Sequence, residues 1–285
     1  MNTDQLIQKL NDALNSESSG RGISYYTKGV ICPKFVQLGQ KYGDVQDTRD
    51  TDTSKLDIGL IFHKLQELYH GDELSALTIE DRDVSVSPAI QAGLKLFLFY
   101  RAHFDSNFWG VPYAVEQAYK DVGSMWGVKE FTFRPDLVVR VTIEDSVRIS
   151  ARYPHIIMDP GLWIIDWKTA SAKDVRAKEK YENSVQFAAY CATLQSLLPD
   201  EDIRGLLAVR VINHKEPTLF DKYNEPHSVQ PFAVRAPDVQ RIEEVRSWLQ
   251  WAEKEIATGE PRLHNCVTYT GICPFLQQGL CDRRF

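Results

Sequence analysis

Residues 162–169 read Leu-Trp-Ile-Ile-Asp-Trp-Lys-Thr, an apolar run that ends in an acid and a lysine two positions apart. Aromatic and β-branched residues in a short run predict a buried strand. Because alternate residues of a strand face the same side, we expect Asp166 and Lys168 to point together while Trp167 points away. An ordinary ion pair at a strand end gives the same pattern, so the triplet 166–168 indicates a catalytic site only if its surroundings support one.

A second acid, Asp136, follows Pro135 on another predicted strand. Hydrolysis of a phosphodiester needs an activated water and charge compensation on the phosphate, and a divalent cation supplies both. Magnesium is typically held by one or two protein carboxylates, so Asp136 and Asp166 would suffice if their strands are neighbours. The ammonium of Lys168 could then orient the water and stabilise charge on the phosphate.

The hydrophobic pattern elsewhere predicts helices before, between and after a group of strands. We expect helices over residues 2–15, 57–70, 88–103, 185–198 and 237–256. We expect strands over residues 111–119, 129–141, 147–151, 161–167, 203–213 and 229–234. This order predicts an α/β domain in which helices flank a mixed central sheet.

The predicted organisation is a helix and linker over residues 1–22, followed by a single domain over 23–285. Within that domain we expect a helical insertion over about 55–105 and a core over about 110–235. A helix and a cysteine-rich segment over 237–285 follow.

Composition excludes several classes of protein. With 43% hydrophobic residues in 285, the chain can bury a substantial core, which argues against disorder. Its net charge of -6 argues against indiscriminate binding to polyanions, although a local basic groove could still bind a phosphate backbone. Neither a long apolar run nor a signal-peptide pattern is present, so we expect a cytoplasmic protein without a membrane span.

Two further pairs of residues share helix faces because their members are four positions apart, namely Gly59 with His63 and Gln186 with Tyr190. Together with Asp136 and the stretch 166–169, in this chain order, they resemble the PD-(D/E)XK nuclease superfamily. The resemblance is to its RecB-like exonuclease branch, which includes the CRISPR-associated adaptation nucleases. It covers most of residues 23–281.

This resemblance implies a restriction-endonuclease-like fold and an Mg²⁺- or Mn²⁺-dependent phosphodiester hydrolase. It implies four metal ligands: His63, Asp136, Asp166 and the backbone carbonyl of Trp167. It implies five residues that act in catalysis or support the site: Asp136, Asp166, Lys168, Gln186 and Tyr190. Glu116 precedes Asp136 on a predicted strand, and we favour a surface position for it over a place in the site.

The five cysteines are an odd number in a chain expected in a reducing compartment, which argues against a disulfide framework. Four of them, one early and three late, would suit a [4Fe-4S] cluster: Cys32, Cys266, Cys273 and Cys281. The distribution resembles AddB-type iron–sulfur nuclease domains, in which a cluster staples the terminal segments together, but the wide spacing of the last three departs from that family. A zinc site that includes His264 and unliganded thiols stay open as alternatives. Cys191, among apolar neighbours, is expected in the core.

Three cations follow the central strand closely, Lys173, Arg176 and Lys178. They predict binding to a phosphate backbone, or else an ordinary solvated helix face. Four aromatic residues could stack on bases or belong to the core: Tyr25, Tyr26, Phe108 and Trp109.

We therefore expect a DNA exonuclease acting on ends or single strands in recombination, repair or spacer acquisition, in a prokaryotic or phage-infected cell. Its partners would be DNA and a repair or recombination protein or a second copy of the chain. One alternative is a catalytically silent nuclease-fold subunit that binds DNA or assembles a complex around a structural metal cluster. Another is an interaction protein that carries a cluster while its partner performs the chemistry.

Overall fold

The computed structural model describes residues 3–14, 54–74, 87–119, 122–172, 176–222, 226–258, 267–268 and 271–272. The chain divides into two compact units. The first comprises Met1–Ser16, Asp52–Gln117 and Arg134–Pro237, and the second comprises Glu17–Thr51, Ala118–Phe133 and Asp238–Phe285. The prediction of one continuous domain over 23–285 stays a prediction.

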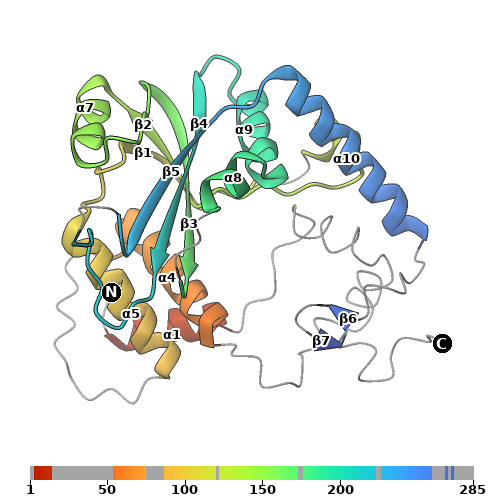
Figure 1. The fold of residues 1–285 in the computed structure, drawn as a ribbon. Coiled ribbons are helices and arrows are strands. Elements are labelled where there is room, and N and C mark those ends of the chain that lie inside the picture. Colours follow the sequence, from red (N-terminus) through yellow and green to blue (C-terminus); the bar gives the residue numbers. More distant parts are fainter. Residues whose placement is uncertain are drawn as a thin grey trace. The chain divides into compact units, whose positions relative to one another are not determined.

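The first unit is built on a five-stranded sheet with the order β1-β2-β3-β4-β5 (Figure 1). The strands are β1 (Val111–Val115), β2 (Leu137–Val141), β3 (Gly161–Ala170), β4 (Ile203–Ile212) and β5 (Val229–Arg235). Only β3 and β4 pair in parallel, and the other three neighbouring pairs are antiparallel. A parallel pair needs a crossover connection, and here helices supply it.

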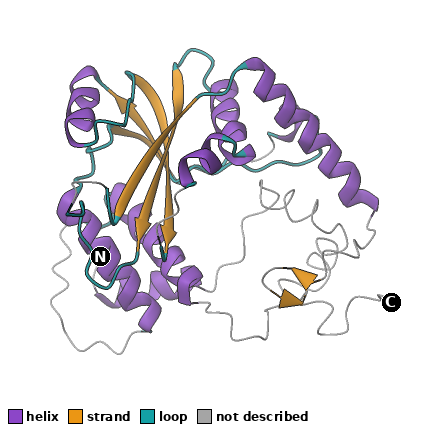
Figure 2. Ribbon diagram, in the orientation of Figure 1, coloured by secondary structure: helices purple, strands orange, loops and turns teal. Residues whose placement is uncertain are grey.

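Helices flank this sheet, as Figure 2 shows. Those of the first unit are α1 (Thr3–Leu14), α4 (Ser54–His70), α5 (Pro88–His103), α7 (Ile143–Arg152), α8 (Ala177–Glu182) and α9 (Val185–Leu197). The crossover from β3 to β4 runs through α8 and α9. The predicted mixed α/β sheet flanked by helices is therefore confirmed.

Alternation along β3 divides the sheet into two faces. Trp163, Ile165 and Trp167 share a buried core with α1, α4 and α5. The residues between them project from the opposite face, where α9 contacts β4. The end of β3 thus carries a tryptophan towards the core and an acid and a lysine towards the other side.

The second unit contains α6 (Gly123–Trp126), α10 (Val239–Thr258), β6 (Val267–Thr268) and β7 (Gly271–Ile272). The side chain of Gln250 in α10 donates to the carbonyl of Trp126, and Glu253 accepts from the N–H of Lys129. Among the described helices of both units, none is long and apolar enough to cross a membrane.

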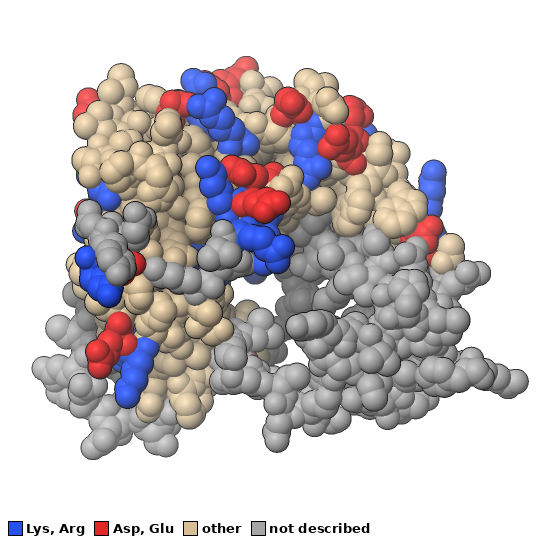
Figure 3. All heavy atoms as spheres, in the orientation of Figure 1, with Lys and Arg blue, Asp and Glu red and all other residues tan. Residues whose placement is uncertain are grey.

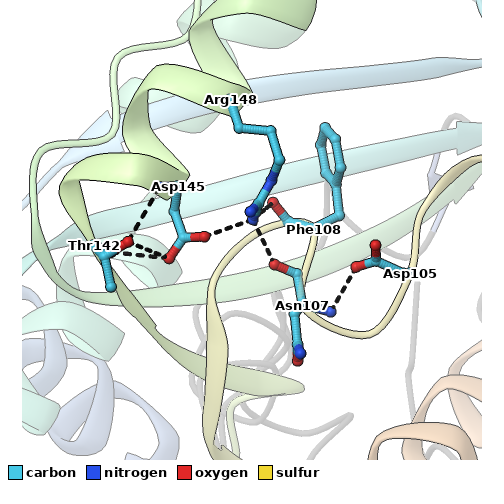
Figure 4. Close-up of polar contacts among 6 residues, drawn as sticks. All are labelled: Asp105, Asn107, Phe108, Thr142, Asp145 and Arg148. Carbon is cyan, nitrogen blue, oxygen red and sulfur yellow. Dashed lines mark hydrogen bonds and ion pairs between the residues drawn. The ribbon is translucent and has the colours of Figure 1, made fainter.

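One predicted strand is wrong, because residues 147–151 lie in helix α7. Thr142 caps this helix by accepting a hydrogen bond from the N–H of Asp145, whose carboxylate accepts in return from the N–H of Thr142. Arg148 then links Asp145 to the carbonyls of Asn107 and Phe108 (Figure 4). The capping box favours the helix, because it satisfies N–H groups that the first helical turn leaves without intrahelical partners. The predicted strand 129–141 is also shortened to 137–141.

We expect Thr142→Ala to lower the free energy of unfolding by about 1 kcal/mol, because the Thr142 hydroxyl accepts from the N–H of Asp145 and donates to its carboxylate, and both hydrogen bonds are lost. Urea denaturation would measure the difference. Ile143→Ala is the matched control, since the side chain of Ile143, next to Thr142, is 68% exposed and caps nothing. Equal stabilities of the two variants would contradict a stabilising role for the cap.

Candidate active site

The candidate site lies at a step in the sheet. The ladder between β2 and β3 stops at Leu137 and Ile165, whereas β3 continues beside β4 as far as Ala170. Asp136 stands immediately before β2, at this step. Its Oδ2 accepts a hydrogen bond of 2.9 Å from the backbone N–H of Trp167. The strand that carries the acid and lysine therefore also orients the second acid.

Asp166 and Lys168 point to the same side, as their spacing predicts. The Nζ of Lys168 lies 2.8 and 3.0 Å from the two carboxylate oxygens of Asp166. Burial and the nearby Asp136 raise the pKa of Asp166 to about 6. Burial opposes the charge of Lys168, yet the two carboxylates outweigh it and raise its pKa. Lys168 is therefore a permanent cation in the site.

Helix α4 brings His63 to the step, with its Nδ1 3.3 Å from Oδ2 of Asp136. Gly59, one turn earlier, explains the close approach of this helix. A Cβ atom there would lie 2.7 Å from Oγ1 of Thr169, closer than real contacts allow. Burial opposes a charged imidazole, but Asp136 raises the pKa of His63. Burial likewise opposes the carboxylate, but His63 lowers the pKa of Asp136.

Glu116 belongs to this cluster, so the preferred surface position is wrong. A carboxylate oxygen of Glu116, one of Asp136 and a ring nitrogen of His63 all lie within 4.8 Å of one another. Glu116 follows β1 with a φ of 44°, and its N–H donates to the carbonyl of Asp136 at 3.1 Å. A left-handed conformation is unusual for glutamate and is often held at functional sites. The one sequence signal available was that Glu116 lies on the predicted strand 111–119, ahead of Asp136.

Burial, followed by the charge of Asp136, raises the pKa of Glu116 to about 8. Arg134 is its cationic neighbour, with Nε 3.1 Å from Oε2. Ionisation of this buried carboxyl costs free energy in the metal-free protein and so lowers its stability. A bound cation would stabilise the carboxylate and offset that cost.

We expect Glu116→Gln to stabilise the metal-free protein at pH 8, on the order of 1 kcal/mol. The native carboxyl holds its proton from its ordinary value of 4.5 up to about 8, so wild-type stability falls as the pH rises through that interval. The glutamine variant should lose less stability over the same range. Melting temperatures in EDTA across these pH values would measure it.

The same variant should bind Mn²⁺ at least about tenfold more weakly than wild type does, because the glutamine amide beside the metal is neutral. Glu201→Gln is the matched control, since Glu201 pairs with Arg140 by an ordinary exposed salt bridge. A Glu116→Gln protein that is less stable at pH 8, with unchanged Mn²⁺ affinity, would contradict this role.

Helix α9 contributes the other two predicted residues to the face of Asp166. Ser184 caps the helix by accepting from the N–H of Phe187, which fixes where it begins. Gln186 hydrogen-bonds to the phenol of Tyr190, and burial, with Asp166, raises the pKa of that phenol to about 12. Tyr190 is therefore a neutral hydrogen-bonding group near the acid–lysine pair.

Trp167 anchors the site from the other face. Its ring stacks on His70 at 5.4 Å, and its indole N–H donates to the hydroxyl of Tyr100 at 3.2 Å. Trp109 donates to the same hydroxyl at 2.7 Å and is buried, as is Phe108. These two aromatic residues belong to the core, so the alternative of base stacking is wrong for them.

The predicted basic run is only partly described. Arg176 precedes α8, and Lys178 is exposed with its Nζ 3.7 Å from Glu182. Basic side chains lie among acidic ones on the face drawn in Figure 3. Cys191 is buried, as predicted. The remaining predicted residues lie outside the described ranges: Tyr25, Tyr26, Cys32, Lys173, His264, Cys266, Cys273 and Cys281.

The donors at the step fit a hard divalent cation. Carboxylate oxygens are typical ligands of Mg²⁺ and Mn²⁺, and one imidazole nitrogen adds to this set. Asp166 is only 2% exposed, and its Oδ2 touches Lys168 without a hydrogen bond of good geometry. Buried polar atoms normally have hydrogen-bond partners, so an oxygen held only by the charge of Lys168 is available as a ligand.

Comparisons with known proteins bear on the family and the fold of the chain. One crystal structure, of a "putative exonuclease" from Eubacterium rectale, aligns over 100% of this chain and 94% of that chain, with a TM-score of 0.51 and 10% identity. Another, of SSO0001, aligns over 98% of this chain and 95% of that chain, with a TM-score of 0.42 and 15% identity. Curated protein sequences give no significant match. The model of the PD-(D/E)XK nuclease superfamily matches residues 34–277, and the chain therefore belongs to that superfamily.

Proposed function

We propose that the protein is a metal-dependent deoxyribonuclease that removes nucleotides from DNA ends or single strands. The observation that carries the proposal is the meeting of His63, Asp136, Asp166 and Lys168 at the end of β3. A chain that kept only the fold would have no chemical reason to hold a buried acid–lysine pair beside a second acid and a histidine.

The residues divide the chemistry between them. His63, Asp136 and Asp166 would hold Mg²⁺ or Mn²⁺, with Glu116 and the carbonyl of Trp167 as further donors. Such an ion, when bound, acidifies water and offsets charge on the scissile phosphate.

Lys168 supplies a fixed positive charge. Because Asp166 and Asp136 raise its pKa in the metal-free protein, it is positioned to act by electrostatic stabilisation of the phosphate. The N–H of Trp167 holds Oδ2 of Asp136 in a fixed position, which preorganises the ligand set. Tyr190 and Gln186 can support Lys168 or contact the substrate from α9.

The exonuclease mode and the role in recombination, repair or spacer acquisition are supported by the resemblance to the RecB-like branch. The solved structure with the similar fold does not identify a substrate for this chain, because a likeness at 10% identity supports only the fold. The exonuclease mode is therefore tested by asking whether cleavage requires a DNA end.

The experiment incubates the protein with linear single-stranded, linear double-stranded and circular DNA, and with RNA, each labelled. We expect release of nucleotides from linear DNA with Mg²⁺ or Mn²⁺ and none in EDTA. Cleavage of circular DNA would overturn the exonuclease mode. Absence of cleavage of every substrate with either metal would overturn the nuclease proposal and favour a silent DNA-binding or assembly subunit.

The cysteine proposal has a separate test. We propose that Cys32, Cys266, Cys273 and Cys281 bind a [4Fe-4S] cluster, because three thiolates late in the chain and one early in it provide the required four ligands. An anaerobic preparation should contain iron and sulfide and absorb broadly in the visible range. A colourless protein that contains zinc would overturn the cluster in favour of the zinc alternative.

A further inference from the structure

Arg210 is a buried cation beside the candidate site that sequence analysis did not single out. It lies in β4, in register with Lys168 of β3 on one side and Gln230 of β5 on the other. Both chain neighbours of Arg210 belong to the core that β4 shares with α4 and α5. Arg210 therefore projects from the opposite face, which also carries Asp166 and Lys168.

The guanidinium is buried without a counter-charge among the described residues. Arg210 is 7% exposed, and its two hydrogen bonds are with neutral acceptors. One NH group donates to Oε1 of Gln230 at 3.2 Å and the other to the carbonyl of Ala172 at 3.0 Å. No described carboxylate lies within 4.0 Å of the guanidinium, and Asp166, on the same face, is already paired with Lys168.

A guanidinium stays charged under all ordinary conditions and carries five N–H donors, of which these contacts use two. A buried charge is normally paired, because desolvation is otherwise not offset. The remaining donors match the oxygens of a phosphate, which arginine binds through a planar fork. Neighbouring strands lie only about 4.8 Å apart, so one phosphate-bearing strand can reach both Lys168 and Arg210.

We propose that Arg210 binds a phosphate of the nucleic-acid strand, next to the phosphate that Lys168 contacts. This inference rests on the proposed function and assigns it a second phosphate subsite on the side of β4. The simpler role for Arg210 is to hold the turn at Ala172 against the sheet. The two roles predict opposite effects on stability and on binding.

The test measures binding of a short fluorescent single-stranded DNA in EDTA, at several salt concentrations, by wild type and Arg210→Met. We expect affinity to fall about tenfold and the slope of log affinity against log salt to shrink by about 0.7, the change for one lost phosphate contact. The melting temperature of the free variant should be unchanged or higher, because an uncompensated buried charge is gone.

Arg204→Met is the matched control, since Arg204 lies on the same strand, is partly exposed and pairs with Asp202. It should keep the wild-type affinity and slope. Arg210→Lys provides a second variant if methionine prevents folding: it keeps the charge and should keep the salt slope while losing affinity. Inorganic phosphate should raise the melting temperature of wild type but not of Arg210→Met.

The outcomes separate the two proposals. If wild type binds DNA and Arg210→Met binds with the same affinity and slope, the subsite is overturned while the nuclease proposal stands. If Arg210→Met has a lower melting temperature and an unchanged salt slope, Arg210 holds the turn at Ala172, and the phosphate subsite is likewise overturned. If wild type binds DNA through Arg210 but cleaves nothing, the subsite stands and the nuclease proposal fails.

Discussion

Asp166→Asn is expected to lower the rate of DNA cleavage by about a thousandfold or more. The asparagine keeps the volume of the side chain but removes the buried carboxylate that pairs with Lys168 at 2.8 Å. It also replaces the charged carboxylate with a neutral amide, which is a poor ligand for a hard cation. Single-turnover cleavage of end-labelled DNA with Mn²⁺ would measure the loss.

Two comparisons make this result specific. Asp202→Asn removes a carboxylate from an exposed pair with Arg204 and should cleave at the wild-type rate. Lys168→Met should also cleave slowly but keep or increase its affinity for Mn²⁺, whereas Asp166→Asn should lose that affinity. Isothermal titration would separate the ligand from the electrostatic group. Equal cleavage by wild type, Asp166→Asn and Lys168→Met would remove this cluster from the reaction.

Trp167→Ala is expected to lower the free energy of unfolding by about 3–5 kcal/mol. The side chain is 2% exposed, and its loss would leave a cavity between the sheet and the helices α4 and α5. The hydroxyl of Tyr100 would also lose one of its two indole donors. Chemical denaturation monitored by far-UV circular dichroism would measure the change.

Trp251→Ala is the control, because that tryptophan is 41% exposed and its replacement should be much less destabilising. Trp167→Phe should recover part of the stability, since a ring can still stack on His70, but not the hydrogen bond to Tyr100. A Trp167→Ala protein as stable as the Trp251→Ala protein would show that the anchor under the site contributes little.

The local pattern of the sequence determined those features that depend on spacing alone. Because strands alternate and helices turn every 3.6 residues, the chain itself placed Asp166 beside Lys168 and Gln186 on the face of Tyr190. Hydrophobic periodicity likewise gave α5 its observed bounds of Pro88–His103. The catalytic roles of these residues stay predictions until the variants are assayed.

Only the tertiary structure decided the features that depend on register and on distant partners. Residues 147–151 have the composition of a strand, but the cap at Thr142 and the contacts of Arg148 make them helical. Glu116 joins the cluster because β1 ends beside Asp136. Arg210 lies beside Lys168 because β4 pairs with β3 in one register, and a shift of one residue would turn its side chain into the core.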